Sequence, residues 1–109
     1  MSKSTKSSPT LDQAFREIEE ELYQTFLQKH KDYGKGNILS IKELGIAFRV
    51  SEKVERLKNL LMSGEAPANE SIEDSWTDIA VYAIIAKLYR QGKFEALEVD
   101  KKLLKQLEK

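Results

Sequence analysis

Apolar residues that recur every three or four positions are the feature of this sequence that most limits its fold. Over residues 11–27 they form one stripe about five turns long, with Glu and Gln on the opposite face. The stripe consists of Leu11, Ala14, Phe15, Ile18, Leu22, Phe26 and Leu27. Thr10 and Gln13 have the spacing of a capping box just before it, and Gly34 follows it. The pattern predicts a helix from residue 11 to residue 30 or 31.

A second segment repeats this helical period. We expect its helix to begin after Ser40, with Glu43 completing another capping box, and to end near Met62, before Gly64. Its apolar stripe consists of Leu44, Ala47, Val50, Val54, Leu57, Leu60 and Leu61. Gly45 lowers the helix propensity by roughly 1 kcal/mol relative to Ala, which favours a kink or a close helix contact there.

A third helix is predicted from Asn69 or Ser71 to Gly92, and a short fourth helix within residues 96–109. The middle of the third helix, residues 79–86, is apolar nearly all round, so we expect it to be the central element. No strand-like alternation competes with these helices. The sequence therefore predicts an all-α, antiparallel helical bundle of three long helices and a short C-terminal helix. Because three neighbours of this size give the third helix little cover, we expect homodimerisation to complete the bundle.

The domain organisation follows from length and composition. Residues 10–109 are predicted to form a single helical domain, preceded by a basic, Ser-rich, disordered tail at residues 1–9. This tail is not followed by an uncharged apolar run, so no secretory signal is expected. No apolar stretch has the roughly 18 to 20 residues needed to span a bilayer. The cytoplasm is the expected location, which is the host cytoplasm if the protein is phage-encoded.

The composition limits which partners and which metal sites are possible. Lys plus Arg equal Asp plus Glu at 18 each, so no overall field favours nucleic acid or a membrane surface as a partner. The absence of Cys excludes a disulfide framework and thiolate metal sites. The single histidine, His30, excludes a zinc site with several His ligands. A bound metal ion would therefore have oxygen ligands, which favours Mg²⁺, Mn²⁺ or Ca²⁺.

Acidic side chains lie about one turn apart on the second and third predicted helices. Glu52 and Glu55 share one face of the second helix, and Glu70, Asp74 and Asp78 follow one another on the third. If the two helices pack antiparallel, these carboxylates converge along one seam that can hold Mg²⁺ against a phosphate. The alternative is that they are solvated surface charges which complement a helix N-terminus.

Three segments of the sequence resemble the family called nucleotide modification associated domain 1. They are residues 29–34 (KHKDYG), 51–60 (SEKVERLKNL) and 69–83 (NESIEDSWTDIAVYA), and the resemblance extends over about residues 11–92. The family is common in phages and prophages. It looks related to the all-α nucleoside triphosphate pyrophosphohydrolases of the MazG and dUTPase type, which bind Mg²⁺ through acidic pairs on neighbouring helices and release pyrophosphate.

This resemblance implies roles for the acidic residues. Glu52, Asp74 and Asp78 would ligate Mg²⁺, or Mn²⁺ in its place, and the metal would bridge the phosphate oxygens of the nucleotide. Either Glu55 or Glu70 would orient the attacking water as general base. The chain would then hydrolyse a nucleoside or deoxynucleoside triphosphate to the monophosphate and pyrophosphate.

The resemblance also implies a substrate-binding surface. Lys53 and Arg56 would stabilise the phosphate chain, and Asp32, Tyr33 and Gly34 would form part of the pocket wall. Tyr33 would stack on the base, and Gly34 would let the backbone approach the ligand. The alternative for Tyr33 and Gly34 is a packed aromatic side chain at a helix end.

Other side chains in these segments have ordinary structural interpretations. Lys29 is interpreted either as a phosphate contact or as a cation that complements the end of the first helix. His30 is interpreted as a solvated residue at that helix end, and Trp76 as part of the core or of a dimer interface.

Two rival functions remain beside the pyrophosphohydrolase. One is a non-catalytic phage protein that sequesters a nucleotide, which predicts binding that survives chelation and produces no turnover. The other is a helical protein-interaction module with solvated acidic faces, which binds no nucleotide.

Overall fold

The computed structural model of the chain describes residues 8–64 and 69–107, and only the backbone of residues 69 and 70. The described residues form the helices α1 (Leu11–Tyr33), α2 (Gly36–Ser63), α3 (Asn69–Arg90), α4 (Lys93–Ala96) and α5 (Lys101–Gln106). Within these residues there is no strand, so the all-α expectation is confirmed. The predicted disordered tail lies, apart from Ser8 and Pro9, outside the described residues.

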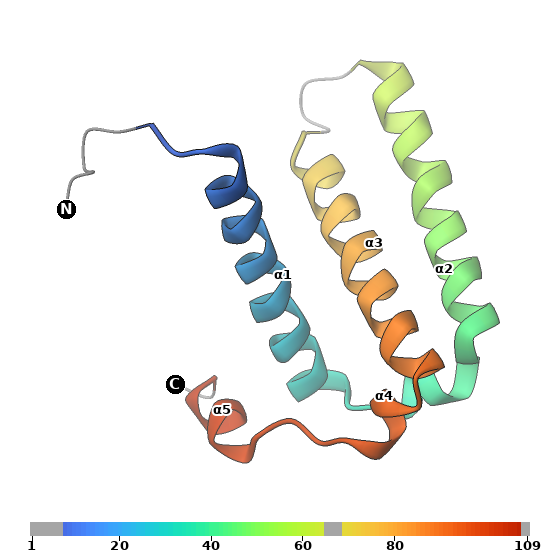
Figure 1. Ribbon diagram of the computed structural model, residues 1–109. Helices are drawn as coiled ribbons and strands as arrows, with labels where there is room; N and C mark the ends of the chain where they lie inside the picture. Colours follow the sequence, from blue (N-terminus) through green and yellow to red (C-terminus); the bar gives the residue numbers. More distant parts are fainter. Residues whose placement is uncertain (1–7, 65–68, 108–109) are drawn as a thin grey trace.

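The helix α3 is the central element of the fold. It forms an antiparallel hairpin with α2 and also packs against α1 and α4 (Figure 1). The helix α1 runs along the side of α3 away from α2, and α5 lies near the C-terminal end of α1 (Figure 1). The central position predicted for the third helix from its apolar surface is confirmed.

The ends of α1 follow the sequence signals. The backbone N–H of Thr10 donates to Oε1 of Gln13 at 2.9 Å, and the N–H of Gln13 donates to Oγ1 of Thr10 at 3.4 Å. This is the predicted capping box. At the other end Gly34 has φ +67°, and its N–H donates to the carbonyl of His30 at 2.8 Å. The helix extends to Tyr33, beyond the predicted end at residue 30 or 31.

The second helix is interrupted close to its predicted start. The helix α2 spans Gly36–Ser63, but it joins two helical segments across a kink at Lys42. The start predicted after Ser40 therefore lies at this kink and not at the first residue of α2. Ile38 packs into the core, and this tertiary contact extends the helix upstream of the local signal. At Lys42 the backbone leaves the helical region, with φ 62° and ψ −173°, a conformation that costs of order 1–3 kcal/mol. The kink lies three residues before Gly45, where one was expected.

The buried core lies at the end of the three long helices where α4 packs against α3. Its main cluster consists of Ile38, Ile46, Val81, Ile85 and Phe94, and Leu27 and Leu57 are buried beside it. The stripe predicted on α2 is only partly correct, because Leu44, Val54 and Leu61 are exposed while Ile46, outside that stripe, is 2% exposed. After the kink, the face of α2 that packs inward follows Ile46, Val50 and Leu57, at spacings of four and seven residues.

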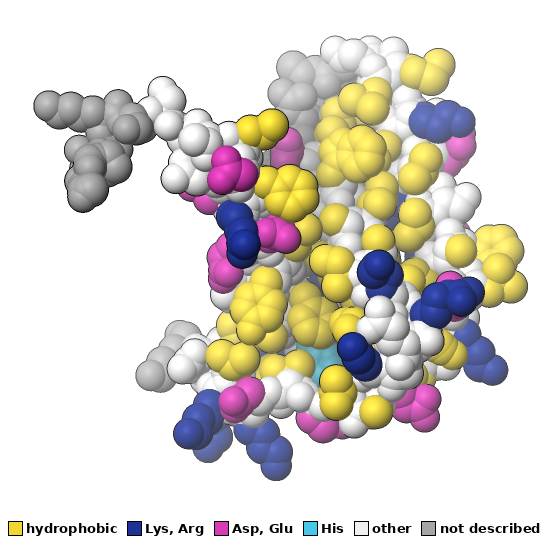
Figure 2. Space-filling view, viewed as in Figure 1, with side chains coloured by type: hydrophobic (Ala, Val, Ile, Leu, Met, Phe, Trp, Pro, Cys, Tyr) yellow, Lys and Arg dark blue, Asp and Glu magenta, His cyan; other side chains and the backbone are white. Residues whose placement is uncertain are grey.

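A second correction concerns α1, whose N-terminal half carries an exposed apolar stripe. Leu11, Phe15 and Ile18 are 87%, 68% and 51% exposed, so this half of the predicted core stripe is not buried in the single chain. Trp76 on α3 is half-exposed as well. Apolar side chains gather over this face of α1 and α3 (Figure 2). The described residues include thirteen exposed large hydrophobic side chains and only seven buried ones, which leaves an unusually large apolar surface uncovered.

The C-terminal segment differs from the single short helix predicted. Gly92, with φ +76°, ends α3, and the short helix α4 follows directly and buries Phe94. Asp100 caps α5 by accepting the N–H of Lys102 at 2.8 Å. Among the described helices, none is both long enough and apolar enough to cross a membrane.

Candidate functional site

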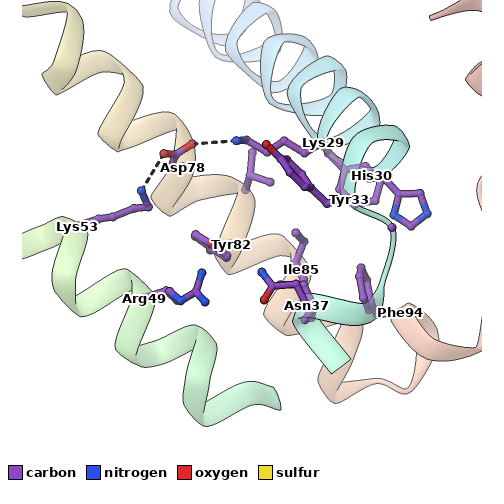
Figure 3. Close-up of a pocket in the computed structure, with 14 residues that line it drawn as sticks. Lys29, His30, Tyr33, Asn37, Arg49, Lys53, Asp78, Tyr82, Ile85 and Phe94 are labelled. Atoms are coloured by element: carbon purple, nitrogen blue, oxygen red, sulfur yellow. Dashed lines mark ion pairs between the residues drawn. The ribbon is translucent and has the colours of Figure 1, made fainter. Parts of the chain in front are cut away.

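A pocket of about 280 Å³ opens where α1, α2, α3 and α4 meet (Figure 3). This volume lies near the lower end of the range of small-molecule sites. The lining residues are Phe26, Lys29, His30, Tyr33, Gly34, Asn37, Ile38, Arg49, Lys53, Asp78, Val81, Tyr82, Ile85 and Phe94.

Helical spacing brings these side chains to the pocket. On α2, Arg49 and Lys53 are four residues apart and therefore lie on one face. On α3, Asp78, Tyr82 and Ile85 lie one turn apart in the same way. The two faces turn toward each other across the pocket (Figure 3).

The wall formed by α1 repeats the spacing. Phe26, Lys29, His30 and Tyr33 follow one another at three, one and three residues, so all four lie on the face of α1 that lines the pocket. Phe94 of α4 closes the end of the pocket next to His30 (Figure 3).

Asp78 joins three helices through two ion pairs. Its Oδ2 lies 3.0 Å from Nζ of Lys53 on α2, and its Oδ1 lies 3.8 Å from Nζ of Lys29 on α1. The side chains of Asp78 and Lys53 are 27% and 32% exposed, so the closer pair is largely shielded from water. Arg49 extends into the same pocket (Figure 3) and has no carboxylate within ion-pairing distance among the described residues. Three cations against one carboxylate give this wall two excess positive charges.

The remaining wall is aromatic and apolar. The His30 ring lies 5.6 Å from that of Phe26 and 6.3 Å, edge to face, from that of Phe94. Tyr82 lies deeper, while Tyr33 stands at the rim and is 74% exposed. A cationic wall beside an aromatic one can hold a planar, anionic ligand at both ends.

The predicted site residues divide into two groups. Tyr33, Gly34, Lys53 and Asp78 line the pocket. The others that are described lie outside it and are exposed, namely Asp32, Glu52, Glu55, Arg56 and Asp74. Of these, Asp32 accepts a hydrogen bond from Nε2 of Gln28 at 3.2 Å, and Glu55 pairs with Lys58 at 3.5 Å. The side chain of Glu70 lies outside the described part of the chain.

The carboxylates predicted as metal ligands do not lie together in the single chain. Within the described residues, no group of three or more His, Cys, Asp or Glu side chains lies close enough together to hold one. Glu52 and Asp74 point to solvent, and each oxygen of Asp78 faces a lysine. Glu52, Asp74 and Asp78 therefore do not form a ligand set for Mg²⁺ in the single chain.

The sequence interpretation missed several lining residues. Arg49 and Tyr82 were not considered, although each lies one turn from a residue that was, Lys53 and Asp78. His30 was interpreted as solvated, yet it is enclosed between two aromatic rings. Counting one further turn along each helix face would have found the first two.

Comparison with known protein families shows which family the chain resembles. A family model described as nucleotide modification associated domain 1 matches residues 29–89, which is more than half of the 109 residues. The chain belongs to this family. The resemblance inferred from the three sequence segments is thereby confirmed. The part that matches the nucleotide modification associated domain begins at Lys29 and ends at Tyr89, so it contains every charged residue of the pocket. Neither the curated proteins nor the solved structures include a significant match to the chain.

Proposed function

We propose that this member of the nucleotide modification associated domain 1 family binds a nucleotide in the pocket between its helices. The observation that supports this most directly is the convergence of Lys29, Arg49 and Lys53 beside an aromatic wall. The family description agrees with this class of ligand.

The cationic wall would hold the phosphate. Arg49 offers a planar guanidinium that can bind two phosphate oxygens at once, whereas Lys53 and Lys29 act as point charges. Because the Lys53 side chain is only 32% exposed and that of Lys29 is half-exposed, their attraction for an anion is less weakened by solvent than that of fully exposed lysines.

The aromatic wall would hold the base. Tyr33 at the rim is free to stack, and Tyr82 and Phe94 lie further inside. Stacking of a base on an aromatic ring contributes about 1–3 kcal/mol and depends little on which base is present. Specificity would then come from the neighbouring polar groups, of which Asn37 is one.

We also propose that the protein hydrolyses the bound nucleotide. The resemblance supports a reaction that converts a nucleoside or deoxynucleoside triphosphate to the monophosphate and pyrophosphate in the cytoplasm, with Mg²⁺ or Mn²⁺ supplied alongside the nucleotide. The resemblance assigns Glu52, Asp74 and Asp78 to the metal and Glu55 or Glu70 to the water. In the single chain, however, both oxygens of Asp78 face lysines, so Asp78 is not proposed as a metal ligand. The assignment of the other carboxylates rests on the resemblance, since the described carboxylates are not gathered into one cluster.

A homodimer is also part of the proposal, and the apolar face of α1 and α3 supports it. Leu11, Phe15 and Ile18 continue the stripe whose C-terminal half packs in the core, and Trp76 is exposed on the neighbouring α3. A second copy that covers this face would complete the helical bundle and remove the exposed apolar surface.

Thermal melts with a nucleotide panel test nucleotide binding. A ligand at ten times its Kd adds about 1.4 kcal/mol to the stability of the folded state, which raises the melting temperature by several degrees. Arg49→Gln should remove most of this shift. Lys58→Gln is the matched control, because it removes one positive charge from α2 outside the pocket. Equal shifts for the two variants would place the ligand elsewhere.

The same samples separate the rival functions. Release of pyrophosphate that requires Mg²⁺ indicates the hydrolase. A melting shift that persists with a chelator, without turnover, indicates the sequestering protein. A complete absence of shifts across nucleoside mono-, di- and triphosphates indicates the protein-interaction module.

A further inference from the structure

We infer that Asp78 is an internal anion that holds Lys53 and Lys29 in the empty pocket and yields them to the phosphate group of the ligand. The inference rests on the proposed nucleotide binding and assigns a positioning role within that site. It differs from the role of metal ligand expected for Asp78 from the family resemblance.

The geometry around Asp78 supports this role. Its two oxygens face different lysines, at 3.0 Å on the α2 side and 3.8 Å on the α1 side. All three groups line the same pocket, and Asp78 lies between the two lysines (Figure 3). Without Asp78, the pocket would contain three unpaired cations close together, whose mutual repulsion destabilises the empty pocket and is relieved when an anion enters. The carboxylate thus keeps the cations in place when no ligand is bound.

A phosphate group can compete successfully for these cations. A phosphate monoester carries a charge of about −1.5 to −2 and three acceptor oxygens, against one charge and two oxygens for Asp78. Arg49 has no carboxylate partner among the described residues, so it can bind the phosphate first. The lysines can then turn from Asp78 to the phosphate without leaving the pocket, since both already line it.

This role predicts the sign of a substitution effect. The ligand must break the ion pairs of Asp78 before it can use both lysines, so their strength is subtracted from the binding free energy. Asp78→Asn removes this competition and should tighten phosphate binding about fivefold, the upper end of what partly exposed ion pairs contribute. A group that binds the nucleotide directly would give the opposite result, because its loss weakens binding, and a metal ligand would give the opposite result when Mg²⁺ is present.

Glu43→Gln is the matched control for Asp78→Asn. Glu43 on α2 pairs with Arg90 on α3 at 3.0 Å, the same separation as Asp78 and Lys53, but neither residue lines the pocket. The control therefore also neutralises one carboxylate and breaks one ion pair between α2 and α3. Its affinity for phosphate should remain within twofold of the wild type.

Calorimetric titration of the full chain tests the inference, with inorganic phosphate and the four deoxynucleoside 5′-monophosphates as probes, first without a divalent cation and then with Mg²⁺. Tighter binding by Asp78→Asn alone supports it. Unchanged or weaker binding by Asp78→Asn, with the wild type binding and Arg49→Gln not, overturns the inference and leaves nucleotide binding intact. If the wild type binds none of the probes, with or without Mg²⁺, both proposals are overturned.

A measurement on the wild type covers the case in which Asp78→Asn does not fold. The carbon NMR signal of the Asp78 carboxylate should shift as phosphate is added, because the ammonium of Lys53 leaves it. The carboxylate signal of Glu43 should stay in place. An Asp78 signal that stays constant while phosphate saturates the protein overturns the inference.

Discussion

Replacing Phe15 with Ala tests whether a second copy covers the apolar stripe of α1. The Phe15 side chain is 68% exposed in the single chain. A phenylalanine can bury about 150–250 Å², so roughly 100–170 Å² of Phe15 remains to be covered. At about 25 cal/mol per Å², full burial corresponds to about 2.5–4 kcal/mol per copy. In a symmetric dimer both copies lose this contribution, which weakens association more than about a thousandfold.

Sedimentation equilibrium over a dilution series measures this effect. We expect the wild type to show twice the chain mass of 12.5 kDa at micromolar concentration, and Phe15→Ala to show the mass of a single chain. Met62→Ala is the control, because Met62 is 82% exposed and belongs to α2, which lies on the opposite side of α3 from α1 (Figure 1). Its dimer should dissociate as the wild type does.

Two results would refute the reasoning about α1. One is a wild type that sediments as a single chain at micromolar concentration. The other is a Phe15→Ala dimer as stable as that of the wild type, which would place the contact on a different face. Because Phe15 is mostly exposed in the single chain, the variant should keep its helical circular dichroism, so lost association cannot be attributed to unfolding.

The remaining predictions concern stability. Gly45→Ala should destabilise the fold by up to about 2 kcal/mol in urea denaturation, because a Cβ there would overlap the Ile41 side chain across the kink. Overpacking costs about 1–3 kcal/mol, against the roughly 1 kcal/mol that Ala gains in helix propensity. A more stable variant would contradict the kinked geometry. The hydrogen bond that Lys35 donates to Glu98, together with the positive charge of Lys35, lowers the pKa of Glu98 below its usual 4.5. That stabilisation is complete above pH 4.5 and is lost as the pH falls through the lower folded-state value, so Glu98→Gln should lose less melting temperature on acidification than the wild type. Equal losses would show that the ion pair adds nothing.

The helices could be predicted where local signals determine their ends. The capping box at Thr10, the left-handed glycines after α2 and α3, and the apolar surface of α3 all act within a few residues of where they occur. The start of α2 could not be found in this way, because burial of Ile38 extends the helix past Ser40. Nor does periodicity reveal a break at Lys42, since the apolar residues continue on both sides of it.

The candidate site was only partly predictable for a related reason. Spacing along a helix shows which side chains share a face, and Lys53, which was singled out in this way, does line the pocket. It does not show which face turns toward the neighbouring helix. Asp78 and Glu52 were therefore grouped as carboxylates on one seam, whereas only Asp78 turns into the pocket and meets lysines there.

The order in which the helices contact one another also has a consequence for how the chain folds. The hairpin of α2 and α3 joins neighbours in sequence, while α1 must wait for α3, which lies beyond the whole of α2. Contacts between near neighbours form faster than those that close long loops, so we expect the hairpin to form first and α1 to dock last. During synthesis α1 therefore leaves the ribosome with its apolar stripe uncovered. Pulsed hydrogen exchange would reveal this order as late protection of α1 amides, and early protection of α1 would exclude it.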